Sequence, residues 1–131
     1  MKRLFSILLM LALLFSLCAC AKTHVEKGAE VTLNFVYADK DIHVTLTDEE
    51  AAKVIEYLDK NSYGYLLSSI PSCGFSEDVS LKVGDTVFAI ARDECSNVKD
   101  LSNNNYFDIA PEKMAYIRSL FTKYGGFFPC V

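Results

Sequence analysis

The chain has 131 residues, with 13 basic and 17 acidic side chains and a formal net charge of −4. This length suits one domain and is short for two. The acidic balance excludes nucleic acid as an expected partner, because contacts to phosphates need clustered Lys and Arg.

Residues 1–20 have the pattern of an export signal. Lys2 and Arg3 give a basic start, residues 4–17 are apolar except for two serines, and a polar segment follows Cys20. A basic start, a short apolar stretch and a small-residue cleavage site are typical of secretory signals. The apolar stretch is short for a membrane span, which needs about 20 residues.

Within this signal, the sequence Leu17-Cys18-Ala19-Cys20 resembles the lipobox of bacterial lipoprotein precursors. The resemblance implies that the thiol of Cys20 receives a diacylglyceryl group and that the chain is cut before this residue. Cys18 stands where Ser, Thr or Ala is more usual, and it is small enough to be accepted. Two or three acyl chains hold a protein stably on a membrane, whereas one chain holds it only marginally. The alternatives are an ordinary cleaved signal and an uncleaved membrane anchor.

The expected division is therefore a signal peptide at 1–19, a lipidated cysteine with its tether at 20–29, and a single domain at 30–131. Cleavage removes Lys2 and Arg3, so 11 basic residues remain against 17 acidic ones, for a net charge of −6. An acidic domain is not drawn to anionic lipid, so the acyl chains must attach it. We expect it on the extracytoplasmic face of the cell membrane.

Apolar residues alternate on both sides of the segment Ala38-Asp39-Lys40-Asp41, which predicts a β-hairpin. Pairing Tyr37 with Ile42 places Phe35 opposite Val44. With this register every apolar side chain of the hairpin lies on one face, as a half-buried hairpin requires.

A helix is predicted over residues 48–60. The preceding sequence, Thr47-Asp48-Glu49-Glu50, is a capping box with acidic residues suited to the first turn. Apolar residues then follow at i, i+3, i+4 and i+7, which is the spacing of one helix face. These are Ala51, Val54, Ile55 and Leu58.

A second hairpin is centred on Gly84-Asp85, a dipeptide suited to a tight two-residue turn. Pairing Val83 with Thr86 sets Leu81 against Phe88, again with one apolar face. Residues 106–109 are predicted to form a further strand.

Pro111 opens a final helix, since its missing N–H costs little in the first turn, and Gly125 is expected to end that helix. Its inner stripe is Met114, Ile117, Leu120 or Phe121, and Tyr124. The order β-β-α-β-β-(β)-α predicts an α+β fold, with one antiparallel sheet and both helices on one face.

The register of the second hairpin also brings two cysteines together. Extended outward, it places Gly74 opposite Cys95, so the thiols of Cys73 and Cys95 meet at the open end of the hairpin. Disulfides persist outside the cytoplasm, and this one closes a 23-residue loop, worth roughly 3 kcal/mol. We expect this bridge, with Cys130 left without a partner.

Three other roles remain open for the cysteines. Cys73, Cys95 and Cys130 form a metal site if His43 is a fourth ligand, although zinc sites usually contain closely spaced cysteine pairs. In the second alternative, one cysteine has a redox or nucleophilic role. In the third, all three cysteines are reduced and structural.

The sequence contains no serine-hydrolase, zinc-protease or phosphate-loop motif, so we expect no enzyme and no cofactor. Acidic residues gather at the open end of the second hairpin, beside Arg92. They suit acid–base chemistry or a cation, but a solvated hairpin end is the simpler interpretation. They are Glu77, Asp78, Asp93 and Glu94.

Aromatic residues give the last functional hint. Tyr63 and Tyr65 stand in an aperiodic apolar segment, and Phe127 and Phe128 follow the last helix. They either pack in the core or form a partner surface, since Tyr and Phe are enriched in interface cores.

The domain has a general similarity to small uncharacterised lipoproteins of Gram-positive bacteria, which implies no residue roles. The expected function is a non-catalytic, lipid-anchored module that binds a protein or peptide in the envelope. The alternative is a small metal-binding or redox protein centred on Cys73, Cys95 and Cys130.

Overall fold

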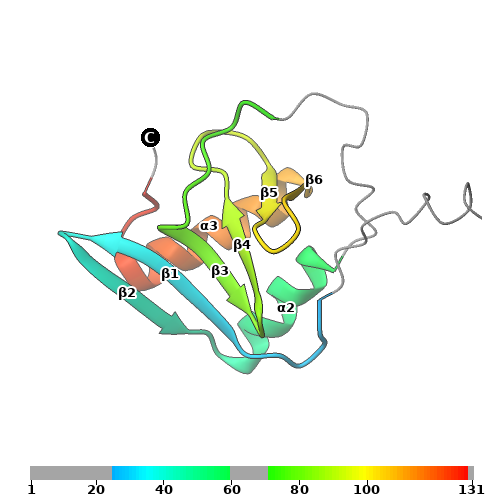
Figure 1. Ribbon diagram of the computed structural model, residues 1–131. Coiled ribbons are helices and arrows are strands. Elements are labelled where there is room, and N and C mark those ends of the chain that lie inside the picture. Colours follow the sequence, from blue (N-terminus) through cyan, green and yellow to red (C-terminus); the bar gives the residue numbers. More distant parts are fainter. Residues whose placement is uncertain (1–24, 60–70, 130–131) are drawn as a thin grey trace, which may run out of the picture.

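The structure, a computed structural model, describes residues 25–59 and 71–129. Figure 1 shows one twisted sheet with both helices on the same side of it. The strands are β1 (Val31–Tyr37), β2 (Lys40–Thr45), β3 (Val79–Val83), β4 (Thr86–Ile90), β5 (Asn97–Asp100) and β6 (Asn105–Asp108), and the helices are α2 (Asp48–Leu58) and α3 (Pro111–Gly125). The predicted α+β class is confirmed.

The six strands lie in the order β2-β1-β3-β4-β5-β6, and every neighbouring pair is antiparallel. The predicted order of elements is confirmed, with one strand added. This strand, β5, has the sequence NVKD, in which Val98 is the one apolar residue. So short a segment has no alternation to detect, and it becomes a strand by pairing with β4 and β6.

The register predicted for the first hairpin was wrong by two residues. Phe35 pairs with Ile42 and not with Val44. The turn consists of Ala38 and Asp39 alone, which have φ values of 49° and 60°. Two positive φ values are typical of a type I′ turn, whose twist matches that of the strands. Because the shift is two residues, the apolar side chains stay on the predicted face.

Two other local predictions are confirmed. The capping box of α2 is complete, because the Glu50 amide donates to Thr47 Oγ1 and the Thr47 amide donates to Glu50 Oε2. In the second hairpin, Leu81 pairs with Phe88, and Gly84 has the positive φ of 56° that its tight turn requires.

One hydrophobic core fills the space between the sheet and the helices. Phe35 on β1 meets Phe121 on α3 edge to face, with ring centroids 6.0 Å apart. Val25 is 2% exposed and belongs to this core. The domain therefore begins before the expected boundary at residue 30, and only residues 21–24 lie between Cys20 and this packed segment.

Glu50 joins the two helices. Its side chain is buried at the start of α2 and accepts hydrogen bonds from Lys123 Nζ and Tyr124 Oη of α3, both at 2.7 Å. Burial acts to raise the pKa of Glu50, but the hydrogen bonds from Lys123, Tyr124 and Thr47 outweigh it and lower the pKa to about 2. This carboxylate therefore stays ionised inside the fold.

The last helix ends one residue later than predicted. Gly125 is its final residue, and Gly126 adopts the left-handed cap, with a φ of 81°. Gly125 is needed for a different reason, because a Cβ there would lie 2.6 Å from Cε2 of Phe35. The absence of a side chain at Gly125 lets α3 approach β1 closely.

We expect Gly125→Ala to destabilise the domain by about 1–3 kcal/mol, the usual cost of overpacking a core. Gly126→Ala has open space around it and should cost about 1 kcal/mol, for its left-handed φ alone. Urea unfolding measures both. Phe35→Leu removes the ring that Gly125→Ala meets, so the cost of Gly125→Ala should fall in that background. An equal cost in both backgrounds would contradict the steric explanation.

Candidate functional site

The cysteine site is built from two segments that are far apart in the sequence. Cys73 precedes β3, and Asp93 and Cys95 lie between β4 and β5. The amide of Arg92 donates to the Gly74 carbonyl at 2.9 Å and joins the segments. One side-chain ligand atom from each of Cys73, Asp93 and Cys95 lies within 4.8 Å of the other two.

The predicted proximity of Cys73 and Cys95 is confirmed by this geometry. The register behind it is wrong, because Gly74 was predicted opposite Cys95, whereas its carbonyl accepts from the Arg92 amide. Both are free cysteines in the structure, so the bond between them stays a prediction. Asp93 is the member of the site that the sequence did not single out, because it was one of four acidic residues at the open end of the hairpin.

Asp93 bridges the two segments. Its Oδ1 accepts from the Cys95 amide at 3.0 Å, and its Oδ2 accepts from the Gly74 amide at 3.1 Å. Burial acts to raise the pKa of Asp93, but the hydrogen bonds from Cys95 and Gly74 lower it. Asp93 is therefore an ionised carboxylate held in a defined orientation.

The thiol of Cys95 has the opposite tendency. Its hydrogen bonds with Cys73 and then Asp93 raise the pKa of Cys95 to about 12. Reactive cysteines have lowered pKa values, because the thiolate is the nucleophile. A raised pKa is therefore the opposite of what a nucleophilic role at Cys95 requires.

Arg118 of α3 holds the loop that carries Asp93 and Cys95. Its Nη2 donates to the carbonyl oxygens of Ala91, Asp93 and Cys95. Its guanidinium lies over the ring of Phe128, 5.3 Å from the centroid. No sequence motif points to Arg118, because the loop and the helix come together only in the folded chain.

The other residues that the sequence singled out fall into two groups, those outside the described residues and those away from the cysteine site. Cys20, Tyr63, Tyr65 and Cys130 lie outside the described residues. His43 lies on β2, where its Nδ1 is 2.7 Å from Asn34 Oδ1, and it does not belong to the cysteine site. His43 is therefore not a fourth ligand beside Cys73 and Cys95, as the metal-site alternative required.

The two phenylalanines after α3 differ in their surroundings. Phe127 is 36% exposed and contacts Tyr37, which is 54% exposed, with ring centroids 5.3 Å apart. Phe128 packs against the core, with its ring 5.5 Å from that of Phe121. Phe127 thus remains a surface residue, whereas Phe128 has a packing role.

The acidic residues near the open hairpin end do not converge on one point. Asp78 accepts from the Ser76 hydroxyl at 2.9 Å, and Glu77 and Glu94 are exposed. Within 25–59 and 71–129, Asp93 is the one acidic residue that joins a group of three potential metal ligands. The cation site that the sequence left open is therefore restricted to the cysteine site.

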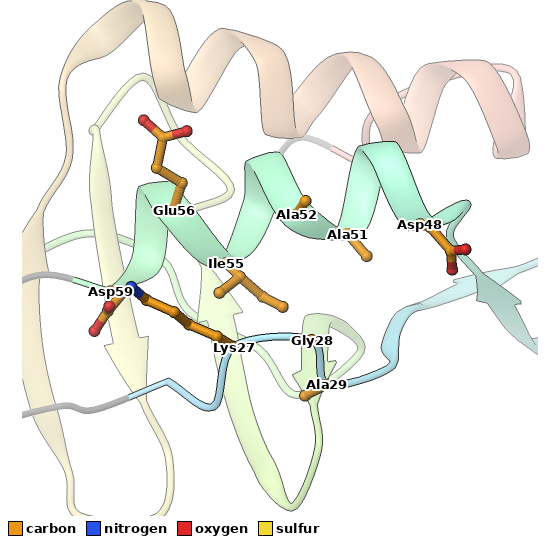
Figure 2. A pocket seen from close by; sticks show the side chains of 9 residues that line it. All are labelled: Lys27, Gly28, Ala29, Asp48, Ala51, Ala52, Ile55, Glu56 and Asp59. Carbon is orange, nitrogen blue, oxygen red and sulfur yellow. The ribbon is translucent and has the colours of Figure 1, made fainter.

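A groove of about 620 Å³ lies between residues 27–29 and α2 (Figure 2). Its apolar lining includes Ala29, Ala51 and Ile55. In Figure 2 the side chains of Lys27 and Asp59 point toward each other at one end. The charged lining residues are Lys27, Asp48, Glu56 and Asp59. The sequence did not predict this groove, because residues 27–29 were assigned to the tether.

The described helices are too short or too polar to cross a membrane. Among the described residues, two candidate sites are considered below, the cysteine site and the groove. Comparisons of the chain with protein-family models, with curated proteins and with solved structures found no match.

Proposed function

We propose that the chain is the precursor of a lipoprotein anchored through Cys20 to the extracytoplasmic face of the cell membrane. Its domain acts by binding a partner, without catalysis. The basic-apolar signal and the lipobox support the anchor, and the missing enzyme motifs favour binding over turnover. The groove along α2 is the observation that carries the binding function.

The groove has the size and chemistry of a recognition site. Ligand sites measure roughly 300–1,000 Å³ and combine an apolar lining with a few polar groups. The three carboxylates and one lysine of this groove give it a net charge of −2. We therefore propose, as the occupant, a peptide segment of an envelope protein that presents an apolar side chain flanked by Lys or Arg.

The anchor places this groove close to the membrane. Val25 is already packed in the core, so residues 21–24 remain as the tether, and four residues can span at most about 13–14 Å. The groove begins at Lys27, and only Val25 and Glu26 separate it from the tether. The partner is accordingly a membrane protein or a protein held close to the bilayer.

Site-specific photocrosslinking in the native envelope tests this proposal. A photoreactive residue at Ala52, which is exposed and lines the groove, should give a discrete crosslinked product. The same residue at Lys53, which is outside the groove and pairs with Glu49, is the positional control. A synthetic peptide with the sequence of the partner's crosslinked region, containing an apolar residue flanked by Lys or Arg, should bind the purified protein.

Charge reversal distinguishes the groove from the rest of α2. Glu56→Lys changes the charge of the groove, and we expect it to abolish the Ala52 product. Glu49→Lys makes the same change at an exposed position of α2 outside the groove, and the product should persist. An equal product from Lys53, or one that survives Glu56→Lys, would overturn the assignment of the groove.

A further inference from the structure

We propose that the reduced thiols of Cys73 and Cys95, together with the carboxylate of Asp93, form a binding site for a thiophilic divalent cation, with Zn²⁺ as the expected ion. Their ligand atoms all lie within 4.8 Å of one another. In a tetrahedral zinc site, bonds of about 2.0–2.3 Å separate neighbouring ligand atoms by about 3.5–3.8 Å. The separations in the structure thus exceed those of a bound ion by at most about 1.3 Å.

The site is pre-organised by the backbone around it. Both oxygens of Asp93 already accept from backbone amides, which fixes the direction of its carboxylate. Arg118 holds three carbonyl oxygens of the ligand-bearing loop. Hydrogen bonds of this kind orient metal ligands and raise affinity, because less order must be created on binding.

The donor atoms select the kind of metal. When the cation binds, it displaces the thiol protons of Cys73 and Cys95 into solvent. The resulting thiolates favour Zn²⁺ and other soft or borderline ions over Mg²⁺ and Ca²⁺, which prefer sites made entirely of oxygen. Cys73, Asp93 and Cys95 are all half-buried, so a cation can reach them while part of the bulk solvent is excluded. Three protein ligands leave a fourth tetrahedral position for solvent or for an exogenous ligand.

The predicted disulfide and the metal site are two states of the same thiols. Oxidised glutathione would take two electrons and two protons from the pair, form the Cys73–Cys95 bond and leave as two glutathione thiols. The bond removes both thiolate ligands. The oxidised protein is therefore expected to bind no metal at this site, and it serves as a control.

Cobalt titration of the full-length chain tests the site. Cys18→Ser, Cys20→Ser and Cys130→Ser are combined so that Cys73 and Cys95 are the remaining cysteines. The reduced protein should bind one equivalent of Co²⁺, with thiolate charge-transfer and tetrahedral absorption bands, and Zn²⁺ should displace it. Non-reducing peptide mapping should find Cys73 joined to Cys95 after oxidation, with the bands lost.

Two variants and a matched control make the result specific. Asp93→Asn should weaken binding by at least about tenfold, and Cys95→Ser should abolish stoichiometric binding. Glu94→Gln removes the neighbouring exposed charge and should change little. Circular dichroism confirms that each variant is folded. Absent binding to the folded, reduced protein, or unchanged affinity in either ligand variant, would overturn the site.

Discussion

Replacing Cys20 by alanine is expected to abolish the acylated, mature form of this protein. The thiol of Cys20 is the proposed point of lipid attachment, and cleavage follows that attachment. Each buried methylene of an acyl chain contributes about 0.8 kcal/mol, so the loss of two or three chains removes essentially all stable anchoring of the mature domain. Intact mass of membrane-extracted wild-type protein should show residues 20–131 plus two or three acyl chains.

Cys18 provides the matched control for this experiment. Cys18→Ala leaves Leu17, Ala19 and Cys20 in place, and alanine is common at this position of the lipobox, so processing should continue. A Cys20→Ala protein found at mature length and wholly in the membrane fraction would contradict lipidation at Cys20.

The second large effect concerns acid stability. The folded domain holds the pKa of Glu50 at about 2, below its ordinary value of 4.5. A lowered pKa stabilises the folded state fully above the unfolded value, and this contribution is lost as the pH falls through the range between the two values. At 1.36 kcal/mol per unit, the contribution is up to about 3 kcal/mol. The domain should lose this stability between about pH 5 and pH 2.

Glu50→Gln tests this assignment. The variant should be less stable than the wild type at neutral pH, and its stability should fall less between about pH 7 and pH 3. Glu49→Gln is the matched control, because Glu49 has an 84% exposed side chain one residue earlier on α2. Urea unfolding at several pH values measures all three proteins. If wild type and Glu50→Gln lose the same stability on acidification, Glu50 is not the responsible group.

The sequence by itself determined those features that depend on short-range signals. The capping box at Thr47, the proline at position 111 and the Gly84-Asp85 turn each act within a few residues, so their elements could be predicted. The proximity of Cys73 and Cys95 was predicted from the same hairpin, although the backbone contact from Arg92 to Gly74 does not continue its register. The α+β class followed from the order of these elements.

The tertiary structure alone decided which distant segments meet. The pairing of β1 with β3 and the addition of β5 depend on how the sheet assembles around its core. The hydrogen bonds of Glu50 with Lys123 and Tyr124 connect residues more than 70 positions apart, and no periodicity encodes them.

In both candidate sites, some features could be predicted from the sequence and others depend on the tertiary structure. The thiols of the cysteine site could be predicted, but Asp93 and Arg118 acquired their roles only when the loop packed against α3. The groove depends on residues 27–29 lying alongside α2, and Val25, which precedes them, is buried in the core. Local patterns specify helices, strands and turns, whereas a site between segments requires burial and hydrogen bonding that only the packed chain provides.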